Sequence, residues 1–281
     1  MFRRKFTLGW TITIGATLAL LLLWTFFPIY WMISTSFKTN MDVFKLPPDF
    51  WPANPTLENY ANLFSTATPI LKFFYNSFLT ALLTVVVTIV LSTLSGYALS
   101  RLKFRFREKI LVSVLITQMF PLVVMLAPLY VLYNKTHLLN TYTGMVIAFT
   151  SFALPFGIWM IKGFVDTVPV ELEQAAMVDG CTRLQAMWKV VLPLTTPGIV
   201  ATGIFAFLDA WNNLLFPMVL TNDITMKTLP AGLVLVFTGA FKHNWGGMMA
   251  ACLISTIPVI IIFILLQRFL VEGLTGGGVK G

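Results

Sequence analysis

Long apolar runs without Asp, Glu, Lys or Arg recur along the chain. Each is close to the length of about 20 residues that a helix needs to cross the hydrocarbon of a membrane. We place the predicted spans near residues 9–33, 74–100, 110–133, 144–163, 198–220 and 247–270. The fifth is the least regular, because Pro193 and Pro197 precede it and Asp209 lies inside it. The pattern predicts an all-α polytopic membrane protein with six transmembrane helices in one domain, 1–281.

The composition agrees with a membrane location. Of the 281 residues, 57% are hydrophobic and 11% are charged, whereas soluble domains carry about 25% charged residues. The mean hydropathy is +0.83. The few polar residues cannot cover a water-exposed surface, so the composition argues against a soluble enzyme. The formal net charge of +8 does not indicate nucleic-acid binding, because the basic residues lie between apolar runs.

The distribution of Lys and Arg predicts the orientation of the spans. Six spans place both termini on one side, and that side collects 13 of the 19 Lys and Arg residues. Under the positive-inside rule this side is cytoplasmic. Both termini and the loop 164–197 are therefore expected in the cytoplasm. The apolar run after Arg3-Arg4-Lys5 is too long for a secretory signal, so we expect the first span to be retained.

The loop 164–197 has the pattern of two short helices. Pro169 suits the first turn of one helix, and Gly180 suits the left-handed residue that ends it. Thr182 is expected to cap a second helix, which Pro193 limits. In this second helix one apolar face is predicted, formed by Leu184, Met187, Trp188 and Val191.

The first of these helices carries polar and small residues with a clear spacing. Glu171 and Glu173 complement the positive end of its dipole. Leu172, Ala175, Ala176 and Asp179 share one face. Two alanines on that face allow another protein's backbone to come close; packing on the chain's own span ends explains the same spacing equally well.

The connection between the last two spans contains a second ambiguous segment. Thr228–Phe241 is apolar but too short to cross a membrane. An interfacial helix, a re-entrant segment and a surface for an external protein all fit this length.

The loop 164–197 resembles the cytoplasmic EAA loop of ABC importer permeases. That pattern is roughly E-A-A, three residues, G, nine residues, I-x-L-P. Here it reads Gln174-Ala175-Ala176, then Gly180, then Val190-Val191-Leu192-Pro193, with the spacing preserved. Gln174 replaces the glutamate and Val190 the isoleucine. The resemblance implies a type I ABC importer permease whose coupling helix, within 169–193, contacts ATPase subunits. The coupling residues it implies are Glu171, Glu173, Gln174, Ala175, Ala176, Asp179, Gly180, Leu192 and Pro193.

Other segments resemble carbohydrate-uptake permeases of the maltose type. These are Pro55–Tyr60, Ala210–Asn213 and the ending Gly273–Gly281. The ending is similar to that of the shorter of the two permease partners in such systems. With the EAA loop, the resemblance covers nearly the whole chain and implies transport of a sugar or oligosaccharide.

The resemblance also implies an assembly in the lipid of a bacterial or archaeal cell (inner) membrane. Its other members are a second homologous permease, two ATPase subunits and an extracytoplasmic substrate-binding protein that delivers the carbohydrate. ATP and Mg would bind the ATPase subunits, since the tail Gly276–Gly281 lacks the Ser or Thr of a phosphate-binding loop. We expect no cofactor, no nucleic acid and no enzymatic activity in this chain, and a flexible tail that contacts the ATPases.

Asp209 is the one acid well inside a predicted span, and an acid in that position is a functional-site hypothesis. Facing a pathway, Asp209, Asn212 and Asn213 would bind sugar hydroxyls, and Trp211 would offer a stacking face. The alternative for Asp209 is an interhelical hydrogen bond. An ion-gradient-driven secondary carrier or channel would also use Asp209, so this residue alone does not separate the classes.

The remaining reactive side chains do not form a pattern. Cys181 and Cys252 are 71 positions apart, and His137 and His243 are isolated from each other. Neither pair has the spacing of a metal site or of a disulfide framework. No metal site is therefore predicted.

Overall fold

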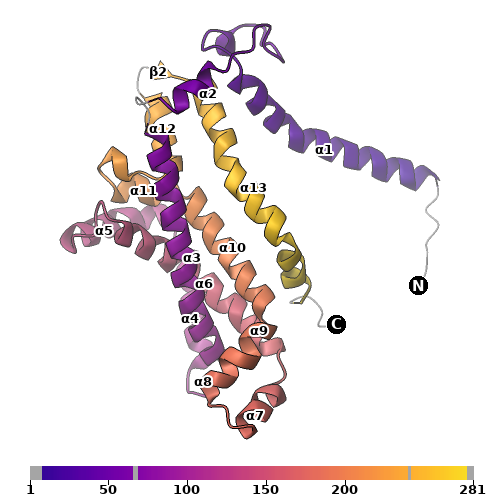
Figure 1. The fold of residues 1–281 in the computed structure, drawn as a ribbon, viewed down its shortest axis with the longest axis vertical. Helices are drawn as coiled ribbons and strands as arrows, with labels where there is room; N and C mark the ends of the chain where they lie inside the picture. The colour runs from indigo at the N-terminus through magenta and orange to yellow at the C-terminus, as the bar shows by residue number, and fades with distance from the viewer. Residues whose placement is uncertain (1–7, 66–68, 240–241, 277–281) are drawn as a thin grey trace. The chain divides into compact units, whose positions relative to one another are not determined.

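A computed structural model describes residues 8–65, 69–239 and 242–276, and it is helical nearly throughout (Figure 1). The first half contains α1 (Leu8–Ser36), η1 (Asp42–Phe44), α2 (Glu58–Leu63), α3 (Ile70–Arg101), α4 (Arg107–Ile116), η2 (Thr117–Met119), α5 (Leu122–Lys135) and α6 (Tyr142–Thr167). The second half contains α7 (Val170–Val178), α8 (Arg183–Ala186), the π-helical η3 (Met187–Val191), α9 (Leu192–Leu194), α10 (Thr196–Asn212), α11 (Leu215–Leu220), η4 (Ile224–Met226), α12 (Leu229–Phe237) and α13 (Trp245–Gly276). Two residues each from β1 (Thr238–Gly239) and β2 (Lys242–His243) pair antiparallel between α12 and α13.

Among the described residues, four helices are long and apolar enough to cross a membrane. They contain Ile12–Ser36, Ile70–Arg101, Tyr142–Thr167 and Trp245–Phe269. Two bent helix pairs raise the number of candidate spans to six. This matches an all-α membrane fold, and the helices α1, α3, α6 and α13 cover four of the predicted spans.

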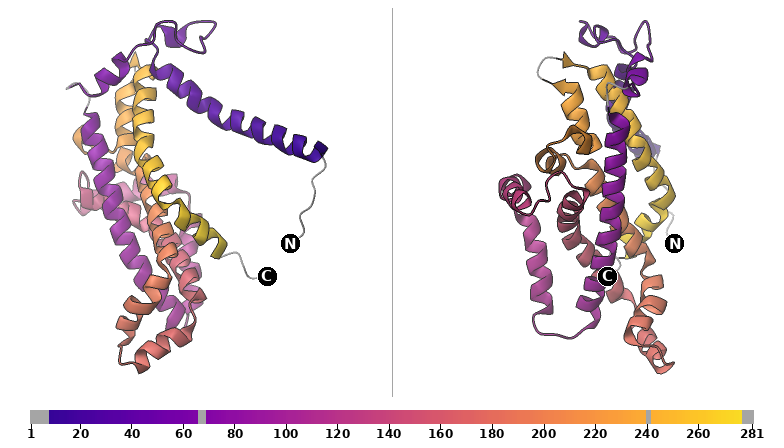
Figure 2. Two further views of the ribbon diagram at one scale, coloured as in Figure 1. Left: turned by 45° about the vertical axis from the view of Figure 1, so that its right-hand side comes forward. Right: turned by 60° about the vertical axis from the view of Figure 1, so that its left-hand side comes forward.

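The third predicted span, near 110–133, is not one straight helix. Arg107–Met119 and Leu122–Lys135 meet at 97°. Pro121 lies at the break with extended backbone, φ −60° and ψ 120°. A proline has no N–H to donate and disfavours a helical residue before it, so the helix cannot continue through Pro121. Figure 2 shows α5 running crosswise to α4.

The fifth predicted span, near 198–220, is also broken. α10 ends at Asn212, and Asn213 has extended backbone, φ −70° and ψ 121°. The Asn213 Oδ1 then accepts a hydrogen bond of 3.1 Å from the N–H of Phe216 in the first turn of α11. The span therefore consists of α10, a break and the short α11. It is preceded by a bend of 78° between Arg183–Leu194 and Thr196–Asn212.

Residue contacts group the chain into two compact units. One comprises Met1–Thr68 with Leu235–Thr256, and the other Pro69–Val234 with Ile257–Gly281. Both α12 and α13 pass from one unit into the other. The single domain 1–281 stays a prediction.

Within the first unit, α1 leaves its apolar side chains exposed, and the segment after it is held by polar contacts. The buried Lys38 Nζ donates to the Asp49 carbonyl at 2.5 Å. The Asn59 amide donates to the Ser36 and Lys38 carbonyls at 2.9 and 2.8 Å. Exposed apolar helices of this kind need lipid or another protein around them.

Within the second unit, α3, α6 and α10 pack side by side, and glycines set their close approach (Figure 1). A Cβ added to Gly96 would lie 2.9 Å from the Lys162 backbone nitrogen, and one on Gly198 would lie 2.3 Å from the Phe164 ring. Small residues are what membrane helices use to bring backbones together. α7 and α8 lie at one end of this bundle (Figures 1 and 2).

Candidate functional site

The first helix of the 164–197 loop forms as its sequence predicts. α7 begins at Val170, directly after Pro169. Gly180 has a φ of +91°, and the N–H groups of Gly180 and Cys181 donate to the Met177 and Ala176 carbonyls at 3.1 and 3.0 Å. This pair of hydrogen bonds is the Schellman ending that glycine permits. The predicted helix end at Gly180 is confirmed.

The second helix starts as predicted but ends later. Thr182 and Gln185 form a capping box, with hydrogen bonds of 2.8 and 3.3 Å between their side chains and backbone N–H groups. The prediction that Pro193 limits this helix is wrong, because α8, η3 and α9 continue to Leu194. The wider π-helical turn of η3 before Pro193 gives the proline ring room that an α-helical turn would deny it.

The same π-helical turn changes which side chains of the second helix are buried. Met187 and Val191 are buried in a cluster with Tyr97, Ile161, Val165 and Leu192. Leu184 and Trp188 are 59% and 60% exposed. The prediction of one apolar face with all four residues is therefore wrong, because a π-helical turn takes more residues than an α-helical one and rotates the face.

α7 presents most of the predicted coupling residues to solvent. Glu171, Leu172, Gln174, Ala175, Asp179 and Gly180 are exposed, and Ala176 is partly buried. Leu192 is buried and Pro193 is exposed at the far end of the loop. The face that holds Leu172, Ala175 and Asp179 is not covered by the rest of this chain and is thus free to contact another subunit.

Glu173 differs from its neighbours because it is buried against the chain itself. Its Oε2 accepts a hydrogen bond of 3.0 Å from the Arg101 Nε, and its Oε1 accepts one from the Tyr97 hydroxyl. The Arg101 Nη2 also donates to the Val168 carbonyl at 2.6 Å. The side chains of Arg101 and Glu173 are 7% and 4% exposed. We call Tyr97, Arg101 and Glu173 the clasp, since they fasten α7 to the end of α3.

Tyr97 and Arg101 were not among the site residues predicted from the sequence. A signal was present, because residues four positions apart share a face of a helix and Arg101 is the first cation after a long apolar run. The sequence alone does not show that Arg101 pairs with Glu173, which lies 72 positions away.

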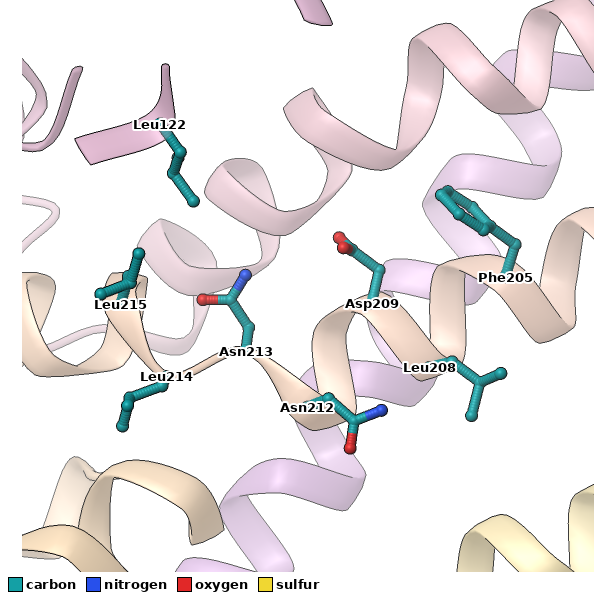
Figure 3. A pocket seen from close by; sticks show the side chains of 8 residues that line it. All are labelled: Leu122, Phe205, Leu208, Asp209, Asn212, Asn213, Leu214 and Leu215. Atoms are coloured by element: carbon teal, nitrogen blue, oxygen red, sulfur yellow. The ribbon is translucent and has the colours of Figure 1, made fainter. Parts of the chain in front are cut away.

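The second candidate site is an open hollow of about 440 Å³ at the break between α10 and α11 (Figure 3). Its polar lining comes from Asp209, Asn212 and Asn213, and its apolar lining from Leu122, Phe205, Leu208, Leu214 and Leu215. Asp209 and Asn213 point to the same side in Figure 3, whereas Asn212 points away from them. Among the residues that the structure describes, none donates a hydrogen bond to the Asp209 carboxylate.

Trp211 does not line this hollow. It is buried, and its ring stacks on Phe207 at 5.5 Å between centroids, with Phe74 edge-on at 5.4 Å. Both ring contacts come from the chain's own core, so the predicted stacking face for a sugar is already covered within this chain.

A network on α3 and α6 fixes the segment after α11. The Asn76 amide donates to the Thr225 and Lys227 carbonyls at 2.8 Å each, and the Tyr142 hydroxyl donates to the Asn76 Oδ1 at 2.7 Å. The Lys227 Nζ donates to the carbonyls of Pro217 (3.2 Å), Met218 (3.3 Å) and Thr221. Burial lowers the pKa of Lys227 below its ordinary value.

The apolar run Thr228–Phe241 begins with α12, whose first turns pack on α3. A Cβ on Gly232 would lie 2.2 Å from the Phe73 ring, and Ala231 and Leu233 are buried. These residues are therefore core rather than a free surface.

Three predicted features fall wholly or partly on residues that the structure does not describe. These are Phe241, the tail 277–281 and Arg3-Arg4-Lys5. Cys181 and Cys252 are free thiols, and over the described ranges no three His, Cys, Asp or Glu side chains gather as a metal site would require.

The sequence matches the family described as "Binding-protein-dependent transport system inner membrane component" over residues 88–276. The chain belongs to this family. It is 39% identical, over 91% of its length and 89% of the relative, to the sulfoquinovosyl glycerol transport system permease SmoH of Agrobacterium fabrum. It is 38% identical to the diacetylchitobiose uptake system permease DasC of Streptomyces coelicolor, covering 95% and 96% of the two chains.

The fold also matches solved transporters. A bacterial ABC transporter involved in the import of alginate superposes with a TM-score of 0.79 at 22% identity, over 95% of this chain and 99% of the other. The MetNI methionine ABC transporter gives a TM-score of 0.55 at 17% identity, over 73% and 94% of the two chains. The predicted fold class, an all-helical ABC importer permease, is confirmed.

Family membership fixes the role of the chain in outline. It is a multi-pass integral membrane protein of the inner membrane and the permease subunit of an ABC importer. ATPase activity belongs to separate subunits, so the chain is a transport subunit and not an enzyme. A second permease, ATPase subunits and a substrate-binding protein are implied by the family. The alternative of an ion-gradient-driven carrier or channel does not hold, because the chain belongs to a family of ABC importer permeases.

Proposed function

We propose that this chain forms half of the translocation pathway of an importer for a sugar or oligosaccharide. The main support is that relatives matching nearly the whole chain are permeases for sulfoquinovosyl glycerol and diacetylchitobiose, which carry sugar rings. The polar hollow beside α10 fits such a substrate, because a carboxylate and an amide side chain bind hydroxyl groups directionally.

Within the pathway, Asp209 and Asn213 are the proposed substrate contacts. They point to the same side of the hollow (Figure 3), and the Asp209 carboxylate retains its accepting capacity for a ligand. Asn212 points away, and Trp211 packs in the core. In this proposal Asn212 lines the hollow without facing Asp209, Trp211 packs behind it in the core, and Phe205 supplies the apolar surface that sugar rings stack on.

We further propose that both termini and the 169–193 loop face the cytoplasm, where two ATPase subunits hold ATP and Mg. The exposed face of α7, with Leu172, Ala175 and Asp179, would contact an ATPase, and Gln174 would donate or accept hydrogen bonds there. The clasp gives this contact a rigid path to α3, because Glu173 and Arg101 fasten α7 to the span. Movement of the ATPases would then move the spans as rigid elements.

Reconstitution with and without the ATPase subunits tests this function. Proteoliposomes that contain the complete complex and the substrate-binding protein should take up labelled sugar when ATP is supplied on the ATPase side. An imposed proton or sodium gradient should give no uptake by the chain alone. Gradient-driven uptake without ATPases would contradict the proposal.

Bulky substitutions on α7 test the coupling face separately. We expect Ala175→Trp to leave the chain in the membrane and to lower ATP-driven uptake strongly, because the side chain would hold the ATPase surface away from α7. Val170→Trp, at an exposed position on the other side of the same helix, is the matched control for a large side chain. Normal uptake by a well-expressed Ala175→Trp chain would exclude this contact.

A further inference from the structure

The short loop 102–106 between α3 and α4 joins two candidate membrane spans, which predicts that it lies at a membrane surface. α3 forms a candidate span that ends at Arg101, and the next candidate span begins at Arg107. A loop that joins two spans over so few residues cannot leave the boundary between hydrocarbon and water. Figure 2 shows it as the turn at the end of the α3 and α4 pair. Whatever binds this loop therefore shares that boundary.

Three cations of this segment are exposed and outnumber its one exposed acid, Glu108. Lys103, Arg105 and Lys109 are all exposed, and no ion pair to any of them occurs in the ranges that the structure describes. The two other cations are used within the chain. Arg101 belongs to the clasp, and the Arg107 Nη1 donates to the Ser100 carbonyl at 3.4 Å. Three positive charges thus remain available to an external anion.

Exposed aromatic rings alternate with these cations. Phe104 and Phe106 are 42% and 52% exposed, and the order Lys103, Phe104, Arg105, Phe106 alternates charge and ring. The Arg105 guanidinium carbon lies 4.9 Å, and the Lys109 Nζ 5.4 Å, from the Phe106 ring centre. Cations held over an aromatic ring keep their charge while the ring remains apolar. The segment therefore combines positive charge with apolar surface over a few residues.

We propose that this segment, Leu102–Lys109, is a binding site for the headgroups of anionic phospholipids. The phosphates would contact Lys103, Arg105 and Lys109, and the rings of Phe104 and Phe106 would lie at the boundary of the acyl chains. Basic residues next to a span attract anionic lipid, and long cationic side chains extend along apolar surface to reach the phosphates. An acidic protein surface would satisfy the cations but would not explain two exposed rings at a lipid boundary.

Photoreactive lipids provide the test. The complete complex is placed in nanodiscs of phosphatidylcholine and phosphatidylglycerol, with a trace of either lipid carrying a photoreactive group on its headgroup. After irradiation, labelled peptides are mapped by mass spectrometry. We expect the phosphatidylglycerol probe to label residues 102–110 several-fold more than the phosphatidylcholine probe.

The variant K103Q/R105Q/K109Q should lose this labelling on the order of tenfold, because each cation near the surface contributes to anionic lipid binding. K72Q/K135Q/R268Q removes the same number of exposed charges elsewhere and should leave it unchanged. Co-purification of the ATPase subunits and the elution volume of the complex show that both variants are folded. Equal labelling by the two probes, or unchanged labelling of K103Q/R105Q/K109Q, would overturn the proposal. So would labelling that appears only when the ATPases are absent, since the loop would then face protein.

Discussion

At the scale of single residues, two glutamates of one helix have opposite surroundings. Glu171 and Glu173 look equivalent in the sequence, since both stand in the first turn of α7. The structure leaves Glu171 exposed and buries Glu173 against Arg101 and Tyr97. Sequence patterns identify the helix and its acidic start, but a two-residue difference in helix phase decides which acid meets α3.

Replacing Glu173 should therefore uncouple the transporter. Glu173→Gln leaves the Arg101 guanidinium buried without its counter-charge, and losing one partner of a buried ion pair costs about 3–5 kcal/mol. We expect ATP-driven uptake to fall far more than ATP hydrolysis, because α7 would no longer be fastened to α3. Glu58→Gln, at an exposed acid in the first turn of α2 and outside the coupling loop, is the control and should transport normally. Equal rates for both variants would show that the clasp does not transmit coupling.

Asp209 can be tested at the same scale. Asp209→Ala removes a charged acceptor from the hollow, and a hydrogen bond to a charged group contributes about 1.5–3 kcal/mol. We expect the uptake rate at low substrate to fall by roughly tenfold or more, with Asp209→Asn intermediate. Asn212→Ala is the comparison and should lower uptake less, since Asn212 lines the same hollow but points away from Asp209 and Asn213 (Figure 3). A normal uptake rate in Asp209→Ala would remove this residue from the pathway.

At the scale of elements, prolines and glycines decide where helices stop, break and cross. The cap at Thr182 and the ending at Gly180 were predictable, because each depends on neighbours within a few residues. The break at Pro121 turned the third expected span into a bent pair, and the fifth is preceded by a bend at Thr195 and interrupted at Asn213. Apolar length alone cannot separate a straight span from a bent one, since both bury the same residues in lipid.

The crossing of α3 and α6 gives a prediction of its own. A Cβ on Gly96 would meet the Ile161 side chain at 2.8 Å and the Lys162 backbone nitrogen at 2.9 Å, and a backbone atom cannot rotate away. Gly96→Ala should separate the helices and lower the thermal midpoint of the purified complex by several degrees, since overpacking costs about 1–3 kcal/mol. Gly163→Ala is the control, because nothing lies within 4 Å of its added Cβ. Alanine has the higher helix propensity, so Gly163→Ala should keep or raise the midpoint, and a midpoint lowered equally by both variants would show that this crossing is not responsible.

The network at the end of α11 should give a pH dependence. Burial disfavours the charged form of Lys227, so its folded pKa lies below the ordinary 10.5. Between these two values the unfolded chain holds more protons than the folded chain, and the free energy of unfolding rises with pH. We expect the stability of the wild type relative to Lys227→Met to increase as pH rises through this window, measured by thermal unfolding. Lys189→Met, at an exposed lysine, should show no such trend.

At the scale of the whole molecule, the direction of the chain in the membrane decides whether α7 can meet an ATPase. The positive-inside rule predicts that the 169–193 loop is cytoplasmic, because it counts Lys and Arg over entire loops. Family membership implies the partners, and the distribution of Lys and Arg predicts the direction of the chain.

Thiol labelling tests this orientation. Cys181 is a free, partly exposed thiol at the end of α7. With Cys252 replaced by Ser, a membrane-impermeant maleimide should label Cys181 in inside-out vesicles and not in right-side-out ones. An Asp223→Cys variant that also lacks Cys181 should show the opposite pattern, since Asp223 lies in an exposed connection beyond α11. Labelling of Cys181 from the outer side would place the loop away from any ATPase.

The sequence by itself determined the features that depend on composition and on local spacing. These are the helical membrane class, the approximate spans, the caps of α7 and α8, and the EAA loop with its partners implied by resemblance. Tertiary structure alone decided which residues meet across long separations. It paired Glu173 with Arg101, packed Trp211 inside the core and left Asp209 and Asn213 lining one hollow. The physical reason is that a periodic pattern fixes a side chain's position on its own helix, whereas the neighbour it contacts depends on how several helices pack.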